Sequence, residues 1–466
     1  MQHLRKAVDD GRPDYREEDG LRKVVPYAYT FQTYVKQRWK GRKILEIFST
    51  EFRDRSPAYY AFALEQGVVR VNDGVIGPDF VLVDGQLISN VIHRHEPPVA
   101  AGPIQILARD DVRGILVVVK PGSMPVHPTG RYNHNTLLHI LKYEHGFEGV
   151  YTNNRLDRLT SGVMVCGMTP KAMSRLGELF GTEGAVRKYY VCRVVGCFPE
   201  EQVISEEPLL CIDRQIGISV VHPEGRPSKT IFQRLSYHAG TDTSVLHCQP
   251  VTGRSHQIRV HLQYMGFPIA NDPVYNSTTA WGKGNGKGGV FIDASNLGKA
   301  PTMQTAIEQS IASHKDQQEQ NGRKTKRDMP GRPPPKEGGE EPGYGSGVDL
   351  SAEARHAIIT LRKHKDMDDR FARERDMTLA PSRGFVSNDN DLTKDVLHDA
   401  DGPYCVRCHL PLLPDPRPDQ LFIWLHALRY SSEDWDYSSE LPTWAREDWQ
   451  PDANTSKHVT GGSQNE

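Results

Sequence analysis

The chain has 466 residues, which is long enough for two or three domains. Its formal net charge of -2 excludes a protein that is basic over its whole surface, so any nucleic-acid binding must use a local groove. Apolar residues make up 37% of the chain and the mean hydropathy is -0.57, which indicates a folded core diluted by disordered polar sequence.

Several features bear on the cellular compartment. The seven cysteines are scattered, as expected in a reducing compartment. No apolar run reaches the length of a transmembrane helix, so we expect no membrane segment. The N-terminus has no apolar signal core, and its acidic residues argue against a transit peptide. The sequence therefore predicts a protein of the cytoplasm or the nucleus and leaves the mitochondrion open.

The N-terminal part of the chain predicts a small module after a flexible start. Residues 1–25 are charged, and we expect them to be flexible. Apolar spacing predicts helices over Leu45–Phe52 and Ala58–Gly67. Residues 68–88 predict short strands joined by Asn-Asp-Gly and Asp-Gly turns. Residues 27–98 are therefore expected to form a module of two helices and short strands.

Residues 102–275 carry most of the globular signal. Strand and helix patterns mix there without a regular alternation of the two, which favours an α+β fold over a doubly wound sheet. The predicted elements are strands at Gly114–Lys120, Ser161–Gly167 and Lys188–Gly196, a helix at Ala172–Phe180, and a strand, turn and helix over Ser244–Gly266.

The C-terminal part changes composition abruptly. Residues 276–351 are rich in glycine, proline and charge, which predicts a disordered insertion. Residues 352–376 predict a charged, exposed helix. Structure is expected to resume over 404–431, which we assign to the same domain as 102–275, and 432–466 form an acidic tail without a clear fold.

The turn that contains Asp157 is the first candidate for chemistry. Asp157 stands between Arg155 and Arg158 in a short polar turn, which by itself is typical of a solvated ion pair. The alternative is that Tyr190 and Arg259 converge on it in a cleft. A carboxylate paired with arginine in a cleft stays ionised and can serve as nucleophile or general base. Spacing alone leaves both interpretations open.

Four motifs, in a fixed order, carry a resemblance to a known family. They are NRLDRLTSG (154–162), VVVKPGSMPVHPTG (117–130), KYYVCRVVG (188–196) and TGRSHQIRVHLQYMGFPIANDPVY (252–275), and LHALRY (425–430) resembles a further late strand. The chain resembles the RluA-type pseudouridine synthases, which isomerise uridine in RNA, and it is similar to the eukaryotic branch of that family.

The resemblance implies a fold. We expect the α+β pseudouridine synthase fold, with a mixed, largely antiparallel sheet, flanking helices and a central catalytic cleft. Residues 27–98 are also similar to the small RNA-binding domain of a ribosomal small-subunit protein, although packing alone would also explain that module.

The resemblance also implies catalytic roles. Asp157 aligns with the aspartate that attacks the ribose C1′ or acts through C2′, and Arg259 with the arginine that pairs with it. Tyr190 aligns with the tyrosine that stacks on the flipped base and helps to remove the C5 proton, and Ile258 with a residue lining the uracil pocket. An isomerisation neither oxidises nor hydrolyses anything, so no cofactor and no metal is expected.

RNA is the implied partner. The target base must leave its stack to reach Asp157, so basic residues should line the site; the predicted contacts are Arg155, Arg158, Arg254 and Lys120. We expect tRNA as substrate, with position 32 of the anticodon loop a specific candidate, while ribosomal and messenger RNA stay open. The alternative is a catalytically silent RNA-binding or ribosome-assembly factor. The oligomeric state is left open.

Some residues depart from the family pattern or fall outside it. Asn154 replaces the usual histidine of the motif, and Leu159 stands where bacterial members commonly have Asp or Ala. The histidines of the family motifs, His127, His256 and His261, are expected to position backbone or RNA.

The sequence CVRCH (405–409) has the spacing of haem attachment, which we reject for lack of context. As half of a zinc site, Cys405 and Cys408 would need two further ligands, for which His409 and His426 are available.

Overall fold

A mixed sheet lies at the centre of the molecule. The computed structural model describes residues 12–52, 56–214, 216–289, 350–363 and 414–451, with short pieces at 343, 346, 348, 396–399, 402–405 and 412. The strands of this sheet are β8 (Gln105–Asp110), β9 (Ile115–Lys120), β10 (Tyr151–Thr152), β11 (Ser161–Gly167), β12 (Arg187–Val195), β13 (Val203–Ser205), β16 (Thr230–His238), β17 (Thr243–Pro250), β20 (Leu425–Ser431) and β21 (Asp436–Ser438).

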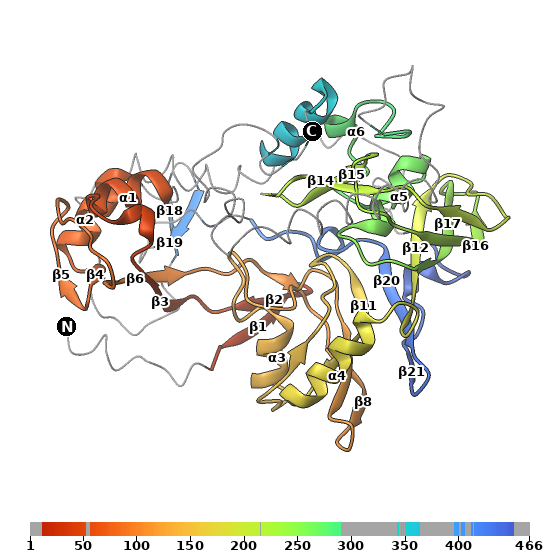
Figure 1. The fold of residues 1–466 in the computed structure, drawn as a ribbon, viewed down its shortest axis with the longest axis horizontal. Helices are drawn as coiled ribbons and strands as arrows, with labels where there is room; N and C mark the ends of the chain where they lie inside the picture. The colour runs from red at the N-terminus through yellow and green to blue at the C-terminus, as the bar shows by residue number, and fades with distance from the viewer. Residues whose placement is uncertain are drawn as a thin grey trace, which may run out of the picture.

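The order across the ten-stranded sheet is β13-β16-β17-β12-β20-β11-β9-β8, with β10 beside β11 and β21 beside β20 (Figure 1). Only β11 and β20 run parallel; the other neighbours are antiparallel. The α+β prediction with a largely antiparallel sheet is therefore confirmed. The strand β20, far away in the sequence, lies in the middle of the sheet.

Helices cover the sheet in two groups. α3 (Leu137–Tyr143) and α4 (Pro170–Gly181) pack with β9 and β11 in one apolar core, in which Val163, Met164 and Val165 are fully buried. α5 (Gln257–Met265) packs with β12 and β17 in a second core. Continuous apolar runs such as Val163–Val165 are typical of strands covered on both faces, and α5 ends at Gly266, as its position predicted.

The N-terminal module has a sheet and a core of its own. β3 (Tyr27–Tyr34), β6 (Leu87–Arg94), β4 (Val69–Val71) and β5 (Gly74–Val75) form its sheet in that order. The two predicted helices are present as α1 (Ile44–Glu51) and α2 (Pro57–Glu65), and they pack on Trp39 and Ile88. The sequence missed β3, whose mostly exposed side chains hide its pairing with β6.

The expected flexible start is wrong for the residues that the structure describes. β1 (Tyr15–Glu18) and β2 (Leu21–Val24) form a three-stranded sheet with β7 (Val99–Ala100). Leu21 is fully buried, and Arg22 forms a salt bridge with Glu144 at 2.5 Å between Nη1 and Oε1. Arg22 and Lys23 form salt bridges with Glu144 and Asp415, which lie far away in the sequence, so local composition cannot reveal them.

Two further C-terminal expectations need correction. Residues 276–289 contain α6 (Thr278–Trp281) with a buried Trp281, and a helix over 352–363 buries Ala357 and Ile358 in the same core, beside β14 (Leu209–Asp213) and β15 (Ile218–Val221). The helix is amphipathic rather than exposed. Most of 290–351 and the rest of 352–376 lie outside the described residues.

The tail that was expected to lack a fold carries β21 and buries Trp435 and Trp444. Its acidic composition concealed these few large apolar side chains; residues 452–466 lie outside the described part. Among the described helices, none is long and apolar enough to span a membrane.

Gly162 gives a test of the parallel contact between β11 and β20. It has φ of 122° and pairs with Ala427, whose backbone a Cβ at this position would strike. We expect Gly162→Ala to lower the free energy of unfolding by about 1–3 kcal/mol, measured by chemical denaturation. In the control, Gly181→Ala, the added Cβ meets nothing within 4 Å. Equal stability of the two variants would contradict this account.

Candidate active site

Asp157 lies in the turn that precedes β11. The backbone N–H of Thr160 donates to the Asp157 carbonyl at 3.1 Å and closes the turn. The side chain of Asp157 remains 33% exposed, whereas the arginine that faces it is 3% exposed. The carboxylate can therefore be reached from solvent while its cationic partner cannot.

Lys120 donates a hydrogen bond to the backbone of this turn and does not contact RNA. It is fully buried at the end of β9, and its Nζ donates to the carbonyls of Pro121 and Met124 at 2.8 Å and of Arg158 at 3.4 Å. Burial lowers the pKa of Lys120 to about 7, although the charge of Asp157 opposes that shift. The expectation that Lys120 binds substrate is wrong, because no part of its side chain reaches the surface.

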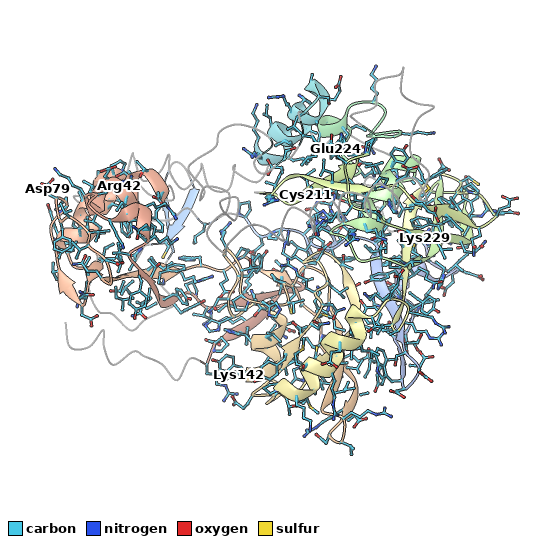
Figure 2. The ribbon with its side chains drawn as sticks, viewed as in Figure 1. Arg42, Asp79, Lys142, Cys211, Glu224 and Lys229 are labelled. Atoms are coloured by element: carbon cyan, nitrogen blue, oxygen red, sulfur yellow. The ribbon has the colours of Figure 1, made fainter. Side chains whose placement is uncertain are left out.

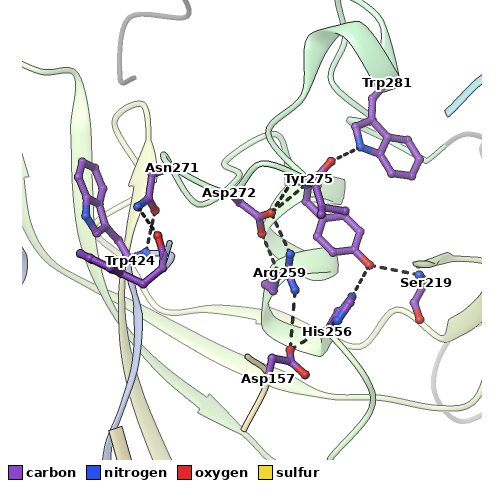
Figure 3. Close-up of polar contacts among 11 residues, drawn as sticks. Asp157, Ser219, His256, Arg259, Asn271, Asp272, Tyr275, Trp281 and Trp424 are labelled. Carbon is purple, nitrogen blue, oxygen red and sulfur yellow. Dashed lines mark hydrogen bonds and ion pairs between the residues drawn. The ribbon is translucent and has the colours of Figure 1, made fainter. Parts of the chain in front are cut away.

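Arg259 on α5 is the cation that faces Asp157 (Figure 3). Its Nη1 lies 3.7 Å from Asp157 Oδ2, so the structure brings together the two residues that the sequence paired. Its shorter contacts go to Asp272, which accepts from Nε at 2.6 Å and from Nη2 at 2.9 Å. The guanidinium therefore has its main ion pair with Asp272 and presents its remaining nitrogen to Asp157.

Asp272 is held rigidly in turn. Its side chain is fully buried, and its Oδ1 accepts the backbone N–H groups of Val274 at 2.9 Å and Tyr275 at 3.0 Å. Burial would raise the pKa of Asp272, but the Arg259 charge and these hydrogen bonds lower it overall. Burial would likewise lower the pKa of Arg259, and Asp272 raises it instead. Both groups are therefore charged.

His256 is the second group near Asp157. It has φ of 57° at the N-cap of α5, and its Nε2 lies 3.6 Å from Asp157 Oδ2. Its Nδ1 is 2.8 Å from the hydroxyl of Tyr275, whose ring lies 4.8 Å from the Arg259 guanidinium. Burial and the charge of Arg259 lower the pKa of His256 to about 4, so it is neutral at pH 7 and Arg259 supplies the positive charge.

Tyr190 enters the site from β12. Its hydroxyl is 2.9 Å from that of Tyr430 on β20, and Asn154 Nδ2 approaches the Tyr430 hydroxyl at 3.5 Å. Burial raises the pKa of Tyr190 well above its ordinary value, with Tyr430 and Asp157 adding to the shift. The phenol is therefore neutral, and Asn154, which departs from the family motif, supports it through Tyr430.

The remaining predicted contacts lie at different depths. Ile258 is buried in the core that also contains Tyr190. Arg155 and Arg254 are exposed, and Arg158 is half-buried with its guanidinium 5.7 Å from the ring of Tyr132. Arg155 is close enough to His256 to lower its pKa slightly.

The other motif histidines have structural roles. His127 Nε2 bonds to the Thr152 hydroxyl at 2.8 Å, and buried His261 lies 2.9 Å from the Thr230 hydroxyl.

Sequence reasoning missed three residues of the site: Asp272, Tyr275 and Tyr430. The first two were visible as the fixed Asp-x-x-Tyr spacing in NDPVY, and the third ends LHALRY. No group of three metal-binding side chains surrounds Asp157 among the described residues.

The ion pair generates a stability prediction. We expect Asp272→Asn to lower the free energy of unfolding by about 3–5 kcal/mol, because it leaves the buried Arg259 charge without its main partner. The double variant Arg259→Met/Asp272→Asn should recover most of that loss, since it removes both charges. Urea denaturation measures both. A double variant no more stable than Asp272→Asn would contradict this view of the pair.

The residues of this site lie within a region that is similar to known proteins. A family model described as RNA pseudouridylate synthase matches residues 114–264, which include Asp157, Tyr190 and Arg259. The human protein "Pseudouridylate synthase RPUSD2" is 40% identical over 444 residues, covering 94% of this chain and 76% of the human protein.

Two yeast relatives carry tRNA positions in their names. In Saccharomyces cerevisiae, "tRNA pseudouridine(32) synthase, mitochondrial" is 46% identical over 273 residues, covering 58% of each chain. "tRNA pseudouridine(31) synthase" from the same yeast is 26% identical over 471 residues, covering 92% of this chain and 97% of the relative. The extent of the human match, together with the family match across the Asp157 site, shows that this chain belongs to the RNA pseudouridylate synthase family.

Proposed function

We propose that this protein isomerises uridine to pseudouridine in tRNA, with Asp157 as the reacting carboxylate. One observation supports this assignment above the others: the carboxylate is accessible while the cation beside it is buried and fixed by a second carboxylate. A surface ion pair would leave both partners mobile and solvated. This arrangement instead holds an anion ready at a defined place.

The proposed reaction uses Asp157 at the sugar. Asp157 either attacks C1′ as the glycosidic bond breaks, or removes a proton from C2′ to start loss of the base; both routes need an anion beside the ribose. The detached uracil rotates and C5 bonds to C1′; on the first route this breaks the bond between Asp157 and C1′, and on the second route Asp157 returns its proton to C2′. The proton on C5 leaves, and N1 takes one up. Atoms and electrons balance within the substrate, so the reaction needs no oxidant, no metal and no cofactor.

Tyr190 is assigned to bind the flipped uracil base. Its ring offers a π-face on which a flipped uracil can stack, with Ile258 beside it in the same core. Its phenol is neutral at rest, so it can take the C5 proton only while it gives its own proton to water. The Tyr430 hydroxyl at 2.9 Å holds the Tyr190 hydroxyl in place for this exchange.

Three arginines around the turn, two exposed and one half-buried, are assigned to RNA phosphates. Arg155, Arg158 and Arg254 surround the Asp157 turn and the start of α5, where phosphate contacts would fix the register of a flipped nucleotide. The N-terminal module is assigned RNA binding through residues 36–43, a basic stretch that includes Arg42. Arg42 and Asp79 lie on the outer end of this module (Figure 2).

The silent-factor alternative is disfavoured by the site itself. A protein that only bound RNA would have no need for a buried arginine aimed at an accessible aspartate, or for two tyrosine hydroxyls in contact beside it. Burying such polar groups costs free energy of folding, and a protein without this chemistry would gain nothing from that cost.

A tritium-release assay tests the reaction. We expect the protein to release tritium from tRNA labelled at uracil C5, and Asp157→Asn to reduce the rate at least about 10³-fold, because the amide cannot act as nucleophile or base. The control is Glu183→Gln, an exposed carboxylate after α4, which should match the wild type. No release by the wild type would overturn the enzyme proposal, and equal release by Asp157→Asn would overturn the role of Asp157.

Mapping tests the substrate. The name of the relative that is 46% identical motivates position 32 of tRNA as the target. Carbodiimide treatment followed by reverse transcription of tRNA incubated with the protein should give a stop one nucleotide 3′ of position 32, and a transcript with cytidine at position 32 should show no such stop. Pseudouridine at position 31 alone, or modification confined to ribosomal RNA, would contradict the assignment.

The compartment is proposed as cytoplasm or nucleus, with the mitochondrion, named for one yeast relative, as the alternative. Imaging of the fluorescently tagged full chain distinguishes them.

A further inference from the structure

Three residues of the types that bind zinc meet where the N-terminal module contacts the C-terminal part of the chain. His93 is the penultimate residue of β6, His95 follows the end of that strand, and Cys405 ends β19 (Gly402–Cys405). Their ligand atoms all lie within 4.8 Å of one another. Figure 1 shows β19 and its partner β18 (Val396–Asp399) beside the N-terminal module, away from the Asp157 site.

The geometry fits three of the four ligand positions of a tetrahedral ion. Cys405 Sγ and His93 Nδ1 are 3.5 Å apart, and the two imidazole rings lie 4.9 Å apart and nearly perpendicular. In a tetrahedral zinc site, with Zn–S of about 2.3 Å and Zn–N of about 2.0–2.1 Å, sulfur and nitrogen ligand atoms are about 3.5 Å apart. Cys405 is 2% exposed, whereas both histidines are half-buried.

The backbone explains why the two histidines point the same way. In an extended chain, residues two apart share a face. Arg94, between the two histidines, donates to the Gly130 carbonyl at 3.0 Å. Glu96, which follows His95, accepts the backbone N–H groups of Asn133 and Asn135 at 2.8 and 2.9 Å. The alternate residues Arg94 and Glu96 therefore bind the catalytic domain, which leaves His93 and His95 to face Cys405.

We propose that His93, His95 and Cys405 bind a structural zinc ion that ties the N-terminal module to the chain segment leading into β20. Thiolate with imidazole in tetrahedral geometry selects zinc among the common divalent ions. The Cys405 thiol would lose its proton to solvent on binding. The ion would serve the fold and take no part in the isomerisation.

The sequence supports the same assignment independently. Cys405 and Cys408 are separated by two residues, the common spacing of paired zinc ligands. Cys408 and His409 lie outside the described residues, and the proposal rests on the three that are described. The sequence interpretation did not identify His93 and His95 as zinc ligands. His426, the candidate from the sequence, bonds instead to Ser161 at 2.8 Å and to Ser439 at 2.7 Å.

Metal analysis of the full chain tests the proposal. The protein, produced with zinc in the medium and purified without chelator, should contain about one zinc per chain. His93→Asn and Cys405→Ser should each lose most of it. The matched controls are His145→Asn, at an exposed histidine, and Cys211→Ser, at a half-buried cysteine, and both should keep it. Wild-type protein with only a trace of zinc, or Cys405→Ser with full zinc, would overturn the proposal.

Cobalt substitution in the wild-type protein tests the same site without a variant that could fail to fold. Wild-type protein stripped by chelator and supplied with Co²⁺ should show the strong visible bands of tetrahedral cobalt and a thiolate-to-cobalt charge-transfer band. Octahedral bands without the thiolate band would overturn the proposal. Tritium release measured on the same zinc-loaded wild type separates this outcome from a failure of the proposed isomerase activity.

Discussion

The site depends on the bidentate ion pair between Arg259 and Asp272. A buried guanidinium is costly unless its charge is neutralised and its N–H groups find acceptors. Asp272 does both, at 2.6 and 2.9 Å, and is itself fixed by two backbone N–H groups. The remaining Nη1 then lies 3.7 Å from Asp157, which stays accessible. The carboxylate of Asp272 therefore allows the buried Arg259 to hold the accessible carboxylate of Asp157 in place.

The sheet brings these residues together from distant parts of the chain. The one parallel contact, between β11 and β20, sets the Asp157 turn beside the strand that carries Tyr430. It requires a close approach of backbones, which Gly162 permits with a φ of 122°. β12 lies on the other side of β20 and presents Tyr190 to Tyr430. Two tyrosines separated by 240 positions thus meet through strand order alone.

Sequence patterns predicted the parts that local chemistry determines. The helix over 257–265 and the apolar strand at Val163–Val165 followed from periodicity, and the pairing of Asp157 with Arg259 followed from the family resemblance. Lys120 was misassigned because a lysine at the end of a strand gives no sign that backbone carbonyls will enclose it. Asp272 stands in a visible motif, but its spacing does not show that its partner is Arg259. The histidines of the Cys405 cluster were missed because tertiary contacts bring them to Cys405.

The most direct test of the central claim uses the variant that separates stability from chemistry. Arg259→Met/Asp272→Asn removes both charges of the pair and leaves Asp157 in place. Single-turnover tritium release from labelled tRNA is measured on protein whose folding is verified by denaturation. The account predicts a folded protein that releases tritium at least about 10²-fold more slowly than the wild type, since the anion has lost its fixed cation. A folded double variant with the wild-type rate would contradict it.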